Sequence, residues 1–224
     1  MSGPFLQKIR KGRAREVNRD KIKNQLYYFW SFYKWIILAV GIAAALIIYF
    51  LAARLTEKET ALSVMLMDCH TEISDEQMNQ DFAGYIGLDI KRYAVSIQNT
   101  LMISEEEGGN YTMTCLARFL SDIGSEKLDV CGMLQQDFEK YDNADTWMEL
   151  TNCLSEEELK ELSDCLYLDA SGVPIGLYAD QLPMLEEYGC YDSEDDRGVI
   201  GIIYNTQRKD MAVSYLKYLA GIGQ

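Results

Sequence analysis

The feature that most constrains this chain is an uncharged run of 19 residues, Trp35 to Ala53, which reads WIILAVGIAAALIIYFLAA. At about 1.5 Å per residue, a helix of this length spans roughly 28 Å, close to the ~30 Å hydrocarbon core of a bilayer. Ten of its side chains are Leu, Ile, Val or Phe, and their insertion contributes on the order of 3 to 6 kcal/mol of favourable free energy. A buried helix of a soluble protein would need an apolar partner on every face, so we predict a transmembrane helix.

The residues on the two sides of this run differ in charge. Residues 1–34 hold nine Lys or Arg and two acidic residues, whereas the chain from Arg54 onward holds 12 basic and 33 acidic residues. Aromatic side chains are frequent in YYFWSFYKW, Tyr27 to Trp35, as is typical of a membrane–water interface. Because cytoplasmic flanks carry the excess of Lys and Arg, we expect a single-pass protein of the cell membrane with a cytoplasmic N-terminus and an extracytoplasmic C-terminal domain.

The chain therefore divides into four predicted parts. They are a basic cytoplasmic tail with its aromatic interfacial belt (1–34), the transmembrane helix (35–53), a short polar stalk (54–60) and an extracytoplasmic domain (61–224). A cleaved signal peptide is disfavoured, since the charged stretch before the apolar run is too long and no convincing small-residue cleavage site follows. The basic tail is expected to attract anionic membrane lipid rather than nucleic acid, because it has no recognisable nucleic-acid-binding fold.

Residues 61–224 alternate apolar runs of strand length with amphipathic segments. Strands are predicted at 61–67, 93–97, 128–134, 173–179 and from Gly198 toward Asn205, and helices after Ser74, Asn110, Ser155 and Thr206. The helix after Ser155 begins with a capping box and is expected to carry Cys165 and Leu166 on its apolar face, and Thr206 is the expected cap of the last helix. This order predicts an α/β fold with one three-layer domain and a mostly parallel or mixed sheet.

Six cysteines in an extracytoplasmic domain raise the question of disulfide bonds. Several of them lie in apolar runs, where a free cysteine behaves as a small hydrophobic residue, so both states stay open. If a bond forms, we expect it to join Cys153 to Cys165 or Cys190. No CxxC occurs and the spacings match no zinc pattern, so no metal site is predicted.

The domain carries no catalytic signature that we recognise, since GxSxG, HExxH and GxxxxGK[ST] are all absent from the sequence. His70, the only histidine, follows a predicted strand, where α/β domains place functional loops. Tyr141 and Tyr178 lie in the loop-rich middle of the chain. We predict a non-enzymatic domain with no catalytic residue and no cofactor, and with His70, Tyr141 and Tyr178 as candidates for a ligand-binding face.

Four segments follow one another as they do in the extracellular solute-binding proteins of bacterial transporters. They are EKLDVCGMLQQDFEKY, WMELTNCLSEEELKELSD, GVPIGLYA and GVIGIIYNTQRKDMAVSYLKYL. Over roughly residues 61–221 the chain resembles that family. The resemblance implies a periplasmic-binding-protein-like fold at a bacterial cell surface, with ligand binding as its function. Members are usually larger and two-lobed, so this domain corresponds to one lobe or a reduced pair, and no ligand-contact residue carries over from the family.

The predicted function is therefore that of a single-pass membrane protein that presents a non-enzymatic, solute-binding-like domain to a ligand or a partner. Its expected partners are membrane lipid, a transporter permease or another envelope protein, and a small-molecule ligand. The alternative is a structural or assembly protein of the cell envelope that acts through protein–protein contacts. A hydrolase would need a pair of carboxylates or a Cys69–His70 site, and neighbours on one turn rarely provide the adjacency of a nucleophile pair.

Overall fold

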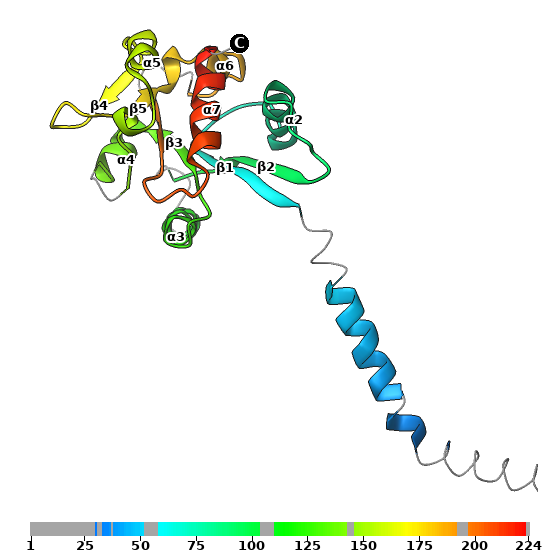
Figure 1. The fold of residues 1–224 in the computed structure, drawn as a ribbon. Helices are drawn as coiled ribbons and strands as arrows, with labels where there is room; N and C mark the ends of the chain where they lie inside the picture. The colour runs from blue at the N-terminus through cyan, green and yellow to red at the C-terminus, as the bar shows by residue number, and fades with distance from the viewer. Residues whose placement is uncertain are drawn as a thin grey trace, which may run out of the picture. The chain divides into compact units, whose positions relative to one another are not determined.

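The structure is a computed structural model that describes residues 30, 33–36, 38–51, 58–103, 110–142, 146–191 and 197–222 (Figure 1). It divides into two compact units, Met1–Glu57 and Lys58–Gln224. In the first unit, the helix Tyr33–Leu51 is long and apolar enough to cross a membrane. Most of the basic tail, and the stalk up to residue 57, lie outside the described residues.

The second unit is an α/β domain built on one six-stranded sheet in the order β2-β1-β3-β6-β5-β4. The strands are β1 (Glu59–Met67), β2 (Tyr93–Leu101), β3 (Val130–Leu134), β4 (Leu166–Leu168), β5 (Pro174–Tyr178) and β6 (Gly198–Ile202). β1 is parallel to β2 and β3, whereas β3–β6, β6–β5 and β5–β4 are antiparallel. The expectation of an α/β fold with a mixed sheet is confirmed.

Helices connect and flank these strands (Figure 1). They are α2 (Asp75–Tyr85), α3 (Asn110–Gly124), α4 (Gln135–Lys140), α5 (Glu156–Glu161), α6 (Pro183–Glu187) and α7 (Lys209–Ala220), with short 3-10 turns η2 (Leu150–Asn152) and η3 (Ala179–Gln181). The predicted start signals of two helices are confirmed. Ser74 accepts a hydrogen bond from the N–H of Gln77 at the start of α2, and Ser155 with Glu158 forms a reciprocal capping box at α5.

The hydrophobic core consists of two clusters, and the side chains of β1 are divided between them. Because successive residues of a strand point to opposite faces, Leu62, Val64 and Leu66 belong to the first cluster, and Met65 and Met67 to the second. The first cluster also holds residues of α2 and α7, namely Met78, Phe82, Tyr215 and Leu216. The second holds residues of α3, α4 and the segment after them, namely Cys115, Phe119, Phe138 and Trp147.

The exposed edge of the sheet at β2 is occupied by side chains of α2. Asn79 accepts a hydrogen bond from the N–H of Ile97 at 2.7 Å. Asp75 accepts one from the N–H of Asn99 at 3.1 Å. Since an open strand edge is a template for pairing with another chain, these two contacts protect the strand that the fold leaves at its margin.

Two sequence predictions in the C-terminal half are wrong: where the helix after Ser155 ends, and which residue caps the last helix. The helix that follows Ser155 ends at Glu161, and Leu166 begins β4 instead of continuing the apolar helical face, because the carbonyl of Cys165 accepts the N–H of Tyr178 at 2.7 Å and pairs with β5. The last helix begins after Arg208, which makes no side-chain cap. Thr206 is not that cap, because its hydroxyl accepts the N–H of Arg208, which precedes the helix, while it donates to Asp129.

A disulfide joins Cys69 to Cys190, with 5.1 Å between their Cα atoms and a separation of 121 positions in the chain. The predicted pairing of Cys153 with Cys165 or Cys190 is therefore wrong. Cys153 and Cys165 are free thiols. The fold brings the carboxyl end of β1 beside the segment after α6, a proximity that the spacing of cysteines along the chain does not reveal.

Candidate functional site

A cavity of about 290 Å³ lies among four segments of the domain. Its lining residues come from the segment after α4 through η2, from the β4–β5 turn and β5, and from the segment between β6 and the first residue of α7. They are Asp142, Trp147, Met148, Glu149, Asn152, Asp169, Ile175, Tyr204 and Lys209. Its volume is just below the range for small-molecule sites, which is about 300 to 1,000 Å³. It therefore suits a small ligand.

Trp147 is the largest side chain of this cavity and is held rigidly. It is 2% exposed, and its ring stacks on Phe138 with 3.9 Å between centroids and 10° between planes. Its segment is bridged to β6 on both sides, since Met148 N–H donates to Ile202 O at 2.8 Å and the N–H of Tyr204 donates to the segment's carbonyl at residue 146. One wall of the cavity is therefore preorganised.

Gly201 in β6 provides the space that this ring occupies. A Cβ atom at this position would lie 2.9 Å from Cε3 of Trp147 and 3.1 Å from the backbone oxygen of Ile175. Carbon atoms do not approach this closely without a shift, so any larger residue would displace the ring or the strand.

The charges that line the cavity are predominantly negative. Asp142, Glu149 and Asp169 contribute three carboxylates, and Lys209 contributes the one amine of the lining. The Nζ of Lys209 donates to the carbonyl oxygen of Asn152 at 2.5 Å, which fixes this ammonium group but leaves its positive charge, so the three carboxylates outnumber it.

The two aspartates of the cavity differ in their surroundings. Oδ1 of Asp169 accepts the N–H groups of Ser171 and Val173 at 2.9 and 2.7 Å and thereby fixes the turn between β4 and β5. Loss of hydration raises the pKa of the Asp142 carboxyl, and the negative charges of Asp169 and Glu139 raise it further. A cation in the cavity would offset the repulsion between Asp142 and Asp169.

The three residues predicted to form a ligand face lie outside the lining of this cavity. His70 is exposed in the loop after β1, next to the disulfide. Tyr141 follows α4 and makes an edge-to-face contact with Phe119, and Tyr178 ends β5 beneath the guanidinium of Arg197, 3.9 Å from its ring centroid. The two tyrosines both pack against the second cluster, and His70 does not belong to it. That they bind a ligand stays a prediction.

The residues that sequence reasoning missed at this site are mainly Asp142, Tyr204 and Lys209. Trp147 lies in the loop-rich middle of the chain, as Tyr141 and Tyr178 do, but its neighbours in the cavity come from distant segments. These segments meet through the isolated bridge between Trp147 and Ile203, a long-range pairing that no local pattern in the sequence indicates.

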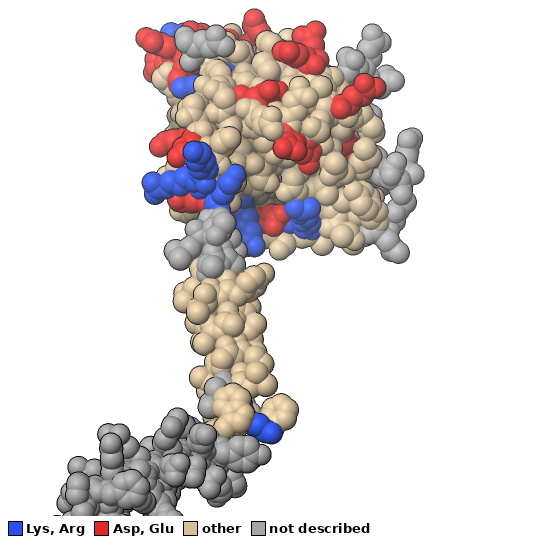
Figure 2. Space-filling view, turned by 90° about the vertical axis from the view of Figure 1, so that its right-hand side faces the viewer, with Lys and Arg blue, Asp and Glu red and all other residues tan. Residues whose placement is uncertain are grey.

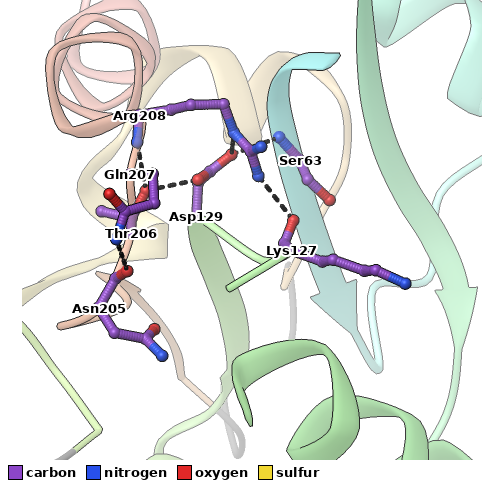
Figure 3. Close-up of polar contacts among 7 residues, drawn as sticks. All are labelled: Ser63, Lys127, Asp129, Asn205, Thr206, Gln207 and Arg208. Carbon is purple, nitrogen blue, oxygen red and sulfur yellow. Dashed lines mark hydrogen bonds and ion pairs between the residues drawn. The ribbon is translucent and has the colours of Figure 1, made fainter. Parts of the chain in front are cut away.

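A second polar cluster surrounds Asp129 at the start of β3, as Figure 3 shows. Asp129 is fully buried, and its carboxylate accepts hydrogen bonds from Ser63 N at 2.7 Å, Thr206 Oγ1 at 2.5 Å and Arg208 Nε at 2.8 Å. Arg208 also donates to the carbonyl oxygen of Lys127 at 2.8 Å. The chain itself satisfies this carboxylate, so the cluster is a structural lock rather than a ligand site.

Among the residues that the structure describes, no group of three or more His, Cys, Asp or Glu side chains is arranged to hold a metal ion. Comparisons of the chain with protein-family models, with curated proteins and with solved structures found no match. The interpretation of the cavity therefore depends on the chemistry of its own residues.

Proposed function

We propose that this chain is a single-pass membrane protein that presents a non-enzymatic binding domain on the extracytoplasmic side. The apolar helix Tyr33–Leu51 supports the anchor, and the basic flank before it supports a cytoplasmic N-terminus. The disulfide Cys69–Cys190 supports the location of the domain, because such bonds form and persist in oxidising compartments outside the cytoplasm.

The domain itself is proposed to be a three-layer, solute-binding-like module. Its support is the division of the core into two clusters, one containing α2 and α7 residues and the other containing α3 and α4 residues. The resemblance to extracellular solute-binding proteins favours the same arrangement, and a transporter permease is then the partner that the module would serve.

The ligand that the cavity supports best is a small organic cation. The observation that carries this proposal is the combination of three carboxylates, one amine that is already hydrogen-bonded, and two aromatic residues, Trp147 and Tyr204, in one small cavity. Carboxylates attract a cation through charge, and aromatic rings attract it through their quadrupole, by about 0.5 to 2 kcal/mol for each good contact.

The test compares choline with its uncharged isostere, 3,3-dimethyl-1-butanol, by isothermal titration calorimetry on the full chain in detergent micelles. We expect choline to bind and the isostere to bind at least tenfold more weakly. Asp142→Asn should weaken choline binding, whereas Asp210→Asn, which removes one carboxylate from α7 outside the cavity, should not. Equal affinities for the two compounds, or equal effects of the two variants, would contradict a cation site.

A second candidate function is assembly through protein contacts, and one observation favours it. On α3 the side chains of Tyr111, Met113 and Leu120 are 45%, 67% and 54% exposed. An envelope protein with an apolar surface would cover them. In this case Met113→Glu with Leu120→Glu should abolish crosslinking to that protein in cells and leave choline binding unchanged. Retained crosslinking would exclude α3 as the contact.

A further inference from the structure

The turn between α2 and β2 holds an apolar side chain in an exposed position, directly before two basic residues. Ile90 is 62% exposed, and Lys91 and Arg92, which follow it, are exposed as well. The turn is ordered by Asp89, whose carboxylate accepts the N–H of Lys91 at 3.0 Å and whose carbonyl accepts the N–H of Arg92 at 3.0 Å. The exposure of Ile90 is therefore a property of a fixed turn.

This turn lies beside the first residues of the domain. The N–H of Glu59 donates to the carbonyl oxygen of Arg92 at 3.0 Å, and Glu59 pairs with Tyr93 in the parallel ladder of β1 and β2. Lys58, which is exposed, immediately precedes Glu59. Residues from two segments, Lys58 on one side and 90–92 on the other, thus meet where the chain enters the domain.

The charge of this end differs from that of the rest of the domain. From residue 58 onward the sequence holds 11 Lys or Arg and 32 Asp or Glu. In Figure 2, most of the visible Lys and Arg lie toward one end of the domain, whereas Asp and Glu are spread over the whole visible face. The acidic residues next to the turn are Glu59 and Asp89, and Asp89 is engaged by the turn itself.

The basic residues of this end differ from many others of the described domain in their ion pairing. Elsewhere in the described part of the domain, five basic side chains bind carboxylates: Arg118, Lys140, Arg197, Arg208 and Lys217. Within the same part, Lys58, Lys91 and Arg92 make no salt bridge, although Arg92 lies 5.2 Å from the ring centroid of Tyr93. Their charges are available to an anionic partner.

We propose that Lys58, Ile90, Lys91 and Arg92 form a membrane-binding end, with the basic side chains on the phosphates of anionic phospholipids and Ile90 in the headgroup boundary. The inference rests on the proposed membrane anchor. Six residues separate Leu51, the last described residue of the apolar helix, from Lys58, and seven extended steps reach at most about 25 Å. Lipid is thus the anionic surface within reach, and basic and apolar side chains together are typical of interfacial binding.

The experiment uses the full chain in nanodiscs of phosphatidylcholine, with or without phosphatidylglycerol, and hydrogen exchange read by mass spectrometry. We expect peptides that cover residues 88–93 to exchange at least about fivefold more slowly when phosphatidylglycerol is present. Lys91→Glu with Arg92→Glu should remove this protection. Lys140→Glu with Lys160→Glu is the matched control, because it makes the same charge change at two exposed lysines of α4 and α5, away from the amino ends of β1 and β2, and should keep the protection.

Each outcome bears on one claim. Exchange that is equal in the two kinds of nanodisc, or protection lost equally in both double variants, overturns the membrane-binding end while the anchor stands. A chain that alkaline carbonate extracts from membranes overturns the anchor itself. Ile90→Ser should lower the protection at high salt, where charge is screened, because only the apolar contact then remains.

Discussion

Arg208 donates from its Nε to Oδ2 of Asp129 across 2.8 Å, and the carboxylate that receives it has no exposed surface. The same carboxylate accepts Ser63 N–H from β1 and the hydroxyl of Thr206 from the turn before α7. Residues that lie 66, 77 and 79 positions from Asp129 in the chain therefore meet on one buried charge. This carboxylate ties the last strand–helix unit to the centre of the sheet.

Replacing Arg208 with Met should destabilise the domain by about 2 to 4 kcal/mol, because a buried carboxylate would lose its counter-charge. Arg118→Met is the matched control, since Arg118 forms an exposed pair with Asp122 at 3.6 Å and should cost at most about 0.5 kcal/mol. Urea unfolding followed by circular dichroism measures both. Equal losses in the two variants would refute the structural lock.

Removal of the disulfide should lower stability without changing the fold. Cys69→Ser is expected to cost about 2 to 4 kcal/mol, because the bond closes a long loop of the unfolded chain. Cys153→Ser, at a half-buried free thiol, should cost less than about 1 kcal/mol. Peptide mapping of the unreduced protein should recover Cys69 linked to Cys190, and any other linkage would contradict the pairing.

Local features of the fold were predictable from the sequence, and long-range ones were not. The side chains of Ser74 and Ser155 each accept a hydrogen bond from the N–H three residues later, which is a local interaction. The apolar runs of β1, β3, β5 and β6 likewise predict buried strands. β4, by contrast, is a strand of three residues that exists because it pairs with β5, and its sequence reads equally well as the continuation of a helix.

The candidate site follows the same division. Trp147 is conspicuous in the sequence, but its neighbours Asp142, Tyr204 and Lys209 become a cavity only when β6 brings the segment at 146–152 beside the turn before α7. The pairing of Cys69 with Cys190 likewise depends on where β1 ends in the sheet. The residue types alone do not indicate these long-range contacts.

Gly201→Ala and Gly84→Ala should have opposite effects on stability. At Gly201 a methyl group would collide with Trp147 and with backbone, and overpacking of this kind costs about 1 to 3 kcal/mol. At Gly84, within α2, a methyl group meets nothing within 4 Å and should stabilise the helix by about 0.5 to 1 kcal/mol. Thermal unfolding of the two variants provides the measurement, and a neutral Gly201→Ala would show that the ring is not fixed as described.

Glu158 should make stability depend on pH in the acid range. Its hydrogen bond with Lys217, followed by those with Ser155, lowers its pKa from 4.5 to about 2. Because the folded pKa is the lower one, the stabilisation is complete above pH 4.5 and is lost as the pH falls toward 2. Glu158→Gln should cost about 0.5 to 1 kcal/mol at neutral pH and flatten the profile. Glu157→Gln, from the same turn, should leave the wild-type profile, and a profile unchanged by Glu158→Gln would refute this role.

Asp142 should affect stability and binding in opposite directions if the cavity is a cation site. Burial, and then the charges of Asp169 and Glu139, raise its pKa, so the ionised carboxylate opposes folding. The stability that protonation of this group provides is present below pH 3.8 and is lost as the pH rises through the raised pKa. Asp142→Asn should therefore leave the melting temperature of the free protein at pH 7 unchanged or higher, with a weaker dependence on acid pH.

Choline should raise the melting temperature of the wild type and raise that of Asp142→Asn much less, because the variant retains the cavity but not its charge. This pattern, in which a side chain costs stability and provides binding, is typical of functional sites. Asp210→Asn should respond to choline as the wild type does. If Asp142→Asn instead loses stability in the absence of any ligand, the carboxylate has a structural role, and the cavity loses the residue on which its charge selectivity depends.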